Sequence, residues 1–469
     1  MNPIVIVIGL LMIIVTPTTL QPSLATANYT TDTPDPLLSD MTTTYLQSNQ
    51  STSTVVDKTD VTIRGIFNRV PDGLVIGNWN QLLQPALDEL NRRHPDMNVK
   101  LEYTSPTAFQ IRNTILNRLS NGDSIDIAII DQFWLGDFAE RGLLRNLTAD
   151  FEHWGRIHDL YEGNLDGCLY NGTVYGLWLW TDVRGMWYWK DLLKQADVNP
   201  DSLKTWDGYI SSAMKLNAAL KDQGIQGVHL VGAPHSPDMW YPYLWMLGGD
   251  ILERKDGHPK KGSYWYPSFN STEGVQALQF LKDQVDAGIK PQKEHYFGRE
   301  FANRTFAVML EVSSMLGQFP RESWPTLEQK VGFIPMFPVP NQTTQTSTMM
   351  GGWELSIPTT SQNSRLSWEL ITIMAQPELL GPFLQQYGYL PTQRVLGDGP
   401  ASEQLKQSVP FYEEMVSMIP YGGIRPNIPE YPEIAEDIHQ AIQQVYNGTK
   451  QPEEALNEAA AKSAKVLGW

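Results

Sequence analysis

Cysteine is almost absent from this chain: of its 469 residues only Cys168 carries a thiol. A single cysteine cannot form an intramolecular disulfide, and it cannot build a cysteine-based metal cluster. Stability therefore has to come from a packed core, for which a composition of 41% hydrophobic residues with 15 tryptophans is ample. We expect Cys168 to be a small, buried apolar residue of that core.

Positive charge is also scarce. Lysine and arginine number 35 against 52 aspartates and glutamates, which gives a formal net charge of −17. Such a chain repels a polyphosphate backbone, and since the sequence contains no local basic patch, we expect no nucleic-acid partner.

Common catalytic motifs are missing as well. The sequence has no Gly-x-Ser-x-Gly elbow, no Walker loop and no His-Glu-x-x-His pair, and its 8 histidines are scattered. We therefore expect neither a metal site nor a cofactor, and no enzymatic activity.

The N-terminal segment has no charged side chain before Asp32. An apolar run covers residues 4–15, and the small residues 25–27 offer a cleavage site, so residues 1–27 are predicted to be a signal peptide. Because the uncharged stretch is long enough to span a bilayer, an uncleaved N-terminal membrane anchor stays open as the alternative. Both interpretations place the body of the protein outside the cytoplasm, extracellular or at the cell surface.

Residues 28–59 are rich in Thr, Ser, Pro, Asp and Asn and poor in large apolar residues, which predicts a disordered stalk. Sequons for N-glycosylation recur along the whole chain and favour a glycosylated surface protein. They begin at Asn28, Asn49, Asn146, Asn171, Asn270, Asn303, Asn341 and Asn447.

The folded part opens with alternating strands and helices. Residues 61–67 and 98–104 are predicted strands, each followed by an amphipathic helix, and the apolar run 125–130 is typical of a parallel strand covered on both faces. This order predicts an α/β sheet, in which ligands gather at the carboxyl ends of the strands. Trp79 and Asp131 follow two of these strands and are candidate ligand contacts. A competing interpretation makes Asp131 the N-cap of the next helix.

Two helices have well-defined predicted apolar faces. The first face comprises Leu82, Leu83, Ala86, Leu87 and Leu90. The second lies near the C-terminus and comprises Ile434, Ile438, Ala441, Ile442 and Val445.

Several short sequence blocks are informative when taken together. The more specific ones are Asn-Gly-Thr-Val-Tyr-Gly-Leu at 171–177 and Gly-Gly-Trp-Glu-Leu-Ser-Ile at 351–357. The others, in chain order, are 87–99, 121–126, 139–144, 187–193, 204–207, 247–250, 388–392 and 425–429. In this order the blocks resemble family 1 of the extracellular solute-binding proteins of ABC importers, which includes maltose- and trehalose-binding proteins. The resemblance covers residues 60–469. One departure is Leu177-Trp178, where the family commonly has Pro after Tyr-Gly.

The resemblance implies an α/β, two-lobed periplasmic-binding-protein fold of type II, the Venus-flytrap arrangement, with a cleft between the lobes. It assigns residues 60–178 and 345–390 to lobe 1, and residues 179–344 and 391–469 to lobe 2.

A sugar offers apolar ring faces and a belt of hydroxyls, so its site needs flat aromatic rings with carboxylates, amides and Arg forks. By resemblance, Trp180 and Asp182 are contacts from the chain crossing between lobes. Strand periodicity places Asp182 on the same face as Trp178 and Trp180, whose competing interpretation is a core role. The predicted ligand-binding residues are Trp79, Asp131, Trp180, Asp182, Trp240, Glu311, Trp353, Glu354 and Arg425.

The implied function is capture of a sugar, a di- or oligosaccharide, for delivery to an ABC permease in the membrane by a monomeric protein that catalyses nothing. One alternative is a binder of another small solute, a polyol or glycerol phosphate. A remote alternative is a glycoside hydrolase that uses the two carboxylates of Asp131 and Asp182.

Overall fold

The computed structural model describes residues 58–68, 79–107, 110–232, 236–257, 264–292 and 298–469. The predicted signal peptide or anchor, and the predicted stalk apart from its last two residues, lie outside these ranges. The described residues all belong to one unit, Asp57–Trp469. Among them, no helix is long and apolar enough to cross a membrane.

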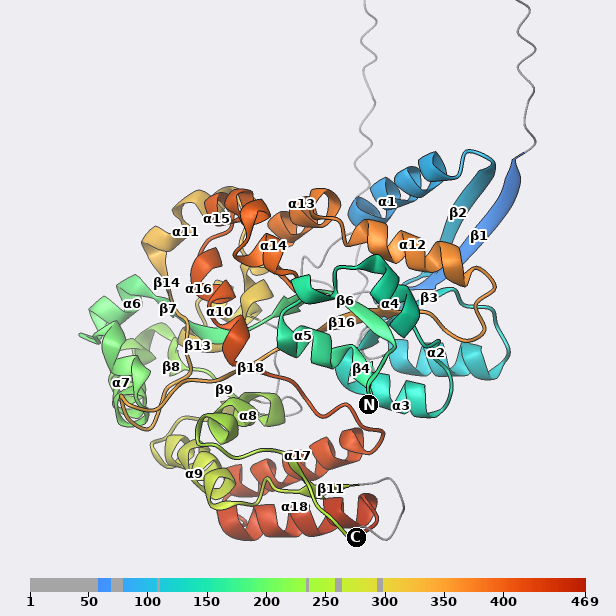
Figure 1. The fold of residues 1–469 in the computed structure, drawn as a ribbon. Helices are drawn as coiled ribbons and strands as arrows, with labels where there is room; N and C mark the ends of the chain where they lie inside the picture. The colour runs from blue at the N-terminus through green and yellow to red at the C-terminus, as the bar shows by residue number, and fades with distance from the viewer. Residues whose placement is uncertain (1–57, 69–78, 108–109, 233–235, 258–263, 293–297) are drawn as a thin grey trace, which may run out of the picture. The chain divides into compact units, whose positions relative to one another are not determined.

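A six-stranded sheet in the order β17-β6-β16-β3-β1-β2 forms one half of this unit (Figure 1). Its strands are β1 Thr59–Ile66, β2 Met97–Thr104, β3 Ile127–Asp131, β6 Gly176–Asp182, β16 Gly351–Ser356 and β17 Leu390–Pro391. β1 pairs in parallel with both β2 and β3, whereas β16 lies antiparallel between β3 and β6. The three predicted N-terminal strands are confirmed, and a strand from far along the chain completes their sheet.

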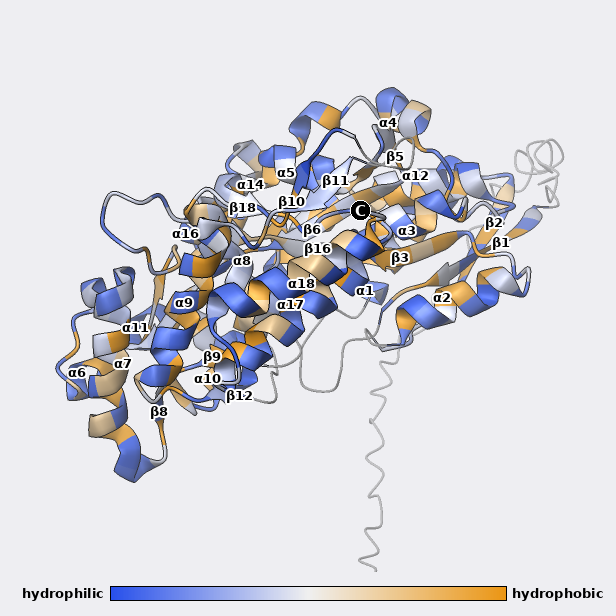
Figure 2. Cartoon of the chain, turned by 90° about the horizontal axis from the view of Figure 1, so that it is seen from below, coloured by the Kyte–Doolittle hydropathy of each residue, from blue (hydrophilic) through white to orange (hydrophobic). Residues whose placement is uncertain are grey.

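β3 is almost completely buried. Its residues Ile127 to Ile130 are fully buried, as the continuous apolar run predicts, and it is orange along its length in Figure 2. Only its last residue, Asp131, reaches partial exposure. A buried strand that ends in a carboxylate places that carboxylate at the carboxyl edge of the sheet.

Helices from both ends of the sequence pack beside this sheet. α1 (Asn80–Arg93) contacts α12 (Ser364–Met374) and α13 (Pro377–Tyr387), while α2 (Ile111–Ser120) packs on β3. The predicted apolar face of α1 is buried, except that Leu87 is only partly covered. The apolar stripe of α1 thus belongs to the hydrophobic core.

A second sheet of four strands has the order β14-β7-β13-β8. Its strands are β7 Arg184–Trp189, β8 Gln226–Val228, β13 Phe306–Val312 and β14 Val331–Ile334. α7 (Trp206–Leu220) packs on β8. Only Val183 separates β6 of the first sheet from β7 of the second, so the chain passes from one sheet to the other within a single residue.

The remaining strands of the described residues pair with one another in two-stranded ladders. They are β4 Leu169–Tyr170 with β5 Thr173–Val174, β9 Leu230–Val231 with β12 Pro291–Gln292, β10 Leu252–Arg254 with β11 Trp265–Pro267, and β15 Thr348–Met349 with β18 Gly422–Gly423.

The C-terminal helices α17 (Tyr431–Tyr446) and α18 (Pro452–Val466) pack against each other and against α9 (Thr272–Asp286). The predicted apolar face of α17 is fully buried, which confirms the periodicity argument. α8 (Ser236–Met246) lies against α9 and α17 and carries Trp240 and Asp238.

Candidate functional site

A register shift in the first sheet places the side chains of Asp182 and Trp178 on opposite faces of the sheet. Asp182 lies opposite Gly351, but Trp178 lies opposite Glu354, with a bulge between Gly352 and Glu354. Residues directly opposite each other on paired strands have their side chains on the same face of the sheet. Residues three apart on one strand, here Gly351 and Glu354, have theirs on opposite faces. The extra residue on β6 therefore places Asp182 and Trp178 on different faces. The prediction that strand periodicity keeps them on one face is wrong, because a bulge resets the alternation.

Asp131 lies on the same face as Asp182, since it is paired with Trp353 across β3 and β16. Its Oδ1 accepts a hydrogen bond of 2.7 Å from Nη2 of Arg425, and the two side chains are only 16% and 10% exposed. The guanidinium of Arg425 also lies 4.2 Å from the ring centre of Phe133. Asp131 is the N-cap residue of a short 3-10 helix, η1 (Gln132–Trp134), as the competing interpretation predicted, but its side chain makes no capping hydrogen bond and pairs with Arg425 instead.

Asp182 has a partner of its own in Arg184, a residue that the sequence predictions missed. Nη1 of Arg184 donates to Asp182 Oδ1 at 3.2 Å and to the Met349 carbonyl oxygen at 3.0 Å. The Gly351 amide donates to the same Oδ1 at 3.2 Å. The signal in the sequence is an Asp-x-Arg triplet at the point where the chain crosses between sheets. We call Asp131, Asp182, Arg184 and Arg425 the Asp–Arg cluster.

Burial controls the electrostatics of the cluster. Burial raises the pKa of Asp131 to about 6, against the opposing charge of Arg425 and with smaller contributions from the carboxylates of Asp238 and Asp182. The pKa of Asp182 is also raised by burial, and the charges of Arg184 and Arg425 oppose that shift. Arg425 thus acts on both aspartates.

The cluster retains hydrogen-bonding capacity for a ligand. Among the described residues, all side-chain hydrogen bonds of Asp131 and Asp182 go to Oδ1, and the buried Nε groups of Arg184 and Arg425 have no partner. Each Asp–Arg pair therefore offers an acceptor and a donor. A hydroxyl group both donates and accepts, so it matches this combination.

Trp353 lies beside the cluster on the same face of β16. Its ring is partly exposed and packs edge-on against Trp134, with ring centres 5.6 Å apart at 82°. The preceding Gly352 has a φ of 154° and lies against the Trp178 indole, where a Cβ would collide. Only glycine fits there, and the local backbone that presents Trp353 depends on it.

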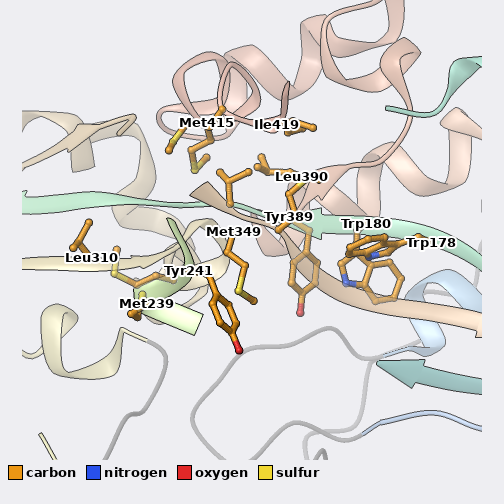
Figure 3. Close-up of a cluster of buried hydrophobic side chains, with 14 of the residues drawn as sticks. Trp178, Trp180, Met239, Tyr241, Leu310, Met349, Tyr389, Leu390, Met415 and Ile419 are labelled. Carbon is orange, nitrogen blue, oxygen red and sulfur yellow. The ribbon is translucent and has the colours of Figure 1, made fainter. Parts of the chain in front are cut away.

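Trp79 and Trp180 belong instead to a buried aromatic cluster. Their rings lie 5.1 Å apart, and Trp180 also stacks on Tyr389 at 5.6 Å and packs on Phe383 at 5.3 Å. Figure 3 shows Trp180 and Tyr389 among other buried side chains near β6. Trp79 and Trp180 are at most 6% exposed, so both are core residues in this conformation.

Three further predicted contacts are fully buried. Trp240 on α8 packs against Tyr241, and Glu311 on β13 accepts the Val312 amide at 2.7 Å. Glu354 points to the face of β16 opposite Trp353. The structure therefore brings together Asp131, Asp182, Trp353 and Arg425, adds Arg184, and buries the other five predicted residues in the interior. Among the described residues, no group of His, Cys, Asp and Glu side chains could hold a metal ion.

The sequence profile of the bacterial extracellular solute-binding protein family matches residues 77–379. The chain belongs to this family. Among relatives of this solute-binding protein is one from Brucella abortus, named as a binding protein, which is 27% identical over 367 residues, 74% of this chain and 81% of the relative. The arabinooligosaccharide-binding protein of Bacillus subtilis is 24% identical over 306 residues, 63% of this chain and 66% of that protein.

Solved structures agree on the fold. An ABC transporter solute-binding protein from Thermotoga lettingae, bound with α-D-tagatose, matches with a TM-score of 0.69 at 23% identity, covering 88% of this chain and 100% of that one. The predicted two-lobed α/β periplasmic-binding-protein fold is confirmed for this solute-binding protein.

Proposed function

We propose that this solute-binding protein is the extracellular sugar-binding subunit of an ABC importer, which captures a di- or oligosaccharide and delivers it intact to a membrane permease. The observation that carries the proposal is the Asp–Arg cluster, whose free carboxylate oxygens and arginine Nε groups lie beside the partly exposed ring of Trp353. A monomeric, glycosylated protein held outside the cytoplasm is part of this proposal.

The chemistry of the cluster favours a neutral, hydroxyl-rich ligand. Vicinal hydroxyls can take the donor and acceptor positions of the two Asp–Arg pairs, while an aromatic face packs on a sugar ring. The arabinooligosaccharide-binding relative and the tagatose-bound solved structure support the sugar class.

The alternatives fit the cluster less well. Glycerol phosphate would bring an anion to two arginines that are already paired with Asp131 and Asp182. A glycosidase needs one carboxyl that stays protonated to act as the acid, whereas Asp131, with a pKa of about 6 beside Arg425, is mostly ionised at pH 7. A polyol shares the hydroxyl chemistry and has to be separated from sugars by experiment.

We propose the lobe boundaries given by the resemblance, residues 60–178 with 345–390 and residues 179–344 with 391–469. The division of the strands between two separate sheets supports them, with the crossing of the chain at Val183 close to the first boundary.

A thermal-shift screen against mono-, di- and trisaccharides, polyols and glycerol phosphates tests the function. We expect a di- or oligosaccharide to raise the melting temperature most, because a ligand at a hundredfold excess over its Kd adds about 2.7 kcal/mol. Mass spectrometry after a day with that ligand should recover only starting material. A shift with glycerol phosphate alone would contradict the sugar class, and accumulation of shorter sugars would make the protein a glycosidase.

Replacing Trp353 with Ala should weaken saccharide binding by about 1 to 3 kcal/mol, because a stacking ring at the centre of a site is lost. Trp353→Phe keeps a flat ring and should retain much of the affinity. Calorimetric titration measures both, and the ligand-free melting temperature serves as the control. Normal affinity combined with a large loss of ligand-free stability would instead identify Trp353 as a core residue.

A further inference from the structure

Behind the Asp–Arg cluster, on the opposite face of the first sheet, lies a set of fully buried polar side chains. We call them the inner polar group. Its members share one property, a polar atom without a hydrogen-bond partner among the described residues. They are Gln132 (Oε1), Asn164 (Oδ1 and Nδ2), Trp178 (Nε1), Glu354 (Oε1 and Oε2) and Ser356 (Oγ).

Three of these side chains come from neighbouring positions on β6 and β16. Glu354 lies directly opposite Trp178, and Ser356 lies opposite Gly176. A Cβ on Gly176 would lie 2.8 Å from Glu354 Oε2 and 2.9 Å from Ser356 Oγ. Both oxygen atoms therefore pack closely against the backbone of Gly176, where no larger residue would fit.

The remaining members come from the covering helix α5 (Glu162–Gly167) and from η1. A Cβ on Gly167 would lie 2.7 Å from the Trp178 ring and 3.2 Å from Cγ of Gln132, so these elements meet there. Asn164 lies one helical turn before Cys168, whose thiol donates to the Asn164 carbonyl oxygen at 3.3 Å. Burial, and then the charge of Glu354, raise the pKa of that thiol well above its ordinary value.

Polar atoms buried without a partner cost free energy, and native proteins satisfy nearly all of them with protein groups or ordered water. The inner polar group contains donors in Asn164, Trp178 and Ser356, and acceptors in Gln132, Asn164 and Glu354. Water, which donates and accepts, can serve this mixed set of donors and acceptors.

We propose that ordered water molecules are enclosed between α5, η1 and the β6–β16 pair, and that this internal hydration site supplies the hydrogen bonds which the inner polar group lacks. Glu354 takes part as a neutral carboxylic acid, because burial and then the negative charge of Asp131 raise its pKa well above the ordinary range. The site also supports the ligand cluster, since Nε2 of Gln132 donates to the Arg425 carbonyl oxygen at 3.2 Å.

A crystal structure of the wild-type protein at a resolution that shows single waters tests the proposal directly. We expect water oxygens within hydrogen-bonding distance of Glu354, Asn164 and Ser356. Empty density at these atoms would overturn the proposal. A cation in their place would do the same, and it would reveal itself through a melting temperature that falls when chelator is added or sodium and potassium are removed.

Two variants of Glu354 give an independent thermal test. Glu354→Gln keeps the polar contacts with water, whereas Glu354→Met fills a similar volume and leaves the waters and their other partners unsatisfied. We expect the Met variant to melt about 2 °C or more below the Gln variant at pH 7. If the internal hydration site held no water, removal of the unpartnered Glu354 carboxyl would stabilise the protein. The Met variant would then melt at the same temperature as the Gln variant or higher.

Discussion

We expect Glu311→Gln to raise the free energy of unfolding by about 3 kcal/mol at pH 7. Glu311 lies fully buried on β13, and burial raises the pKa of its carboxyl to about 8, in spite of the hydrogen bond from the Val312 amide and the charge of Arg184. A glutamate in the unfolded chain has a pKa near 4.5. At pH 7 the folded protein therefore holds a proton on Glu311 that the unfolded chain has released.

The sign of this effect follows from proton binding. Below about pH 4.5 both states hold the proton, and the wild-type protein has its full stability. Between about pH 4.5 and pH 8 only the unfolded state releases the proton, which favours unfolding by about 1.4 kcal/mol per pH unit. Above pH 8 both states are ionised and the loss levels off. The amide side chain of the variant carries no titrating proton, so the variant does not suffer this loss.

Denaturant unfolding of both proteins at several pH values between 4 and 8 measures the difference. The amide oxygen of the introduced glutamine can still accept the Val312 amide, so the two proteins should have similar stability at pH 4. Glu413→Gln is the control, because it makes the same substitution at a side chain that is 72% exposed. A stabilisation by Glu311→Gln that stays constant from pH 4 to pH 8 would contradict the raised pKa.

The sequence predicted the elements whose periodicity is strong. The continuous apolar run that becomes β3 and the stripe of α17 are buried as expected, because a single pattern decides both element and face. Asp131 was also predicted as the residue that leaves the buried strand at the carboxyl edge of the sheet. Its neighbours Trp353 and Arg425 come from distant segments, and only the family resemblance could suggest them.

The remaining features depend on pairing and packing that a sequence does not display. The bulge that turns Asp182 toward Asp131 arises from the register between β6 and β16, and strand alternation alone gives the opposite face. A carboxyl side chain near the end of a strand can be either a ligand contact or a buried neutral acid. Glu311 and Glu354 are fully buried, and their sequence context does not distinguish them from Asp131.

The pH dependence of sugar binding should follow the protonation of Asp131. Burial raises the pKa of this carboxyl to about 6, so it is mostly ionised at pH 7 and becomes protonated below pH 6. If the ionised form accepts the hydroxyls of the sugar, affinity should be nearly constant above pH 7 and fall toward tenfold per pH unit below pH 6. Titration calorimetry from pH 5 to pH 8, with the saccharide that gives the largest thermal shift, measures this profile.

Asp131→Asn assigns that profile to one residue. The variant should bind about 1.5 to 3 kcal/mol more weakly at pH 7, the range for a hydrogen bond to a charged group, and its profile should be flatter. Asp137→Asn is the matched control, because Asp137 is another buried carboxylate, paired with Arg112 and Arg141 and outside the Asp–Arg cluster. It should keep wild-type affinity and the wild-type profile. Normal binding by Asp131→Asn, or an unchanged slope below pH 6, would remove Asp131 from the ligand site and leave Asp182 with Arg184 as the polar contact to test next.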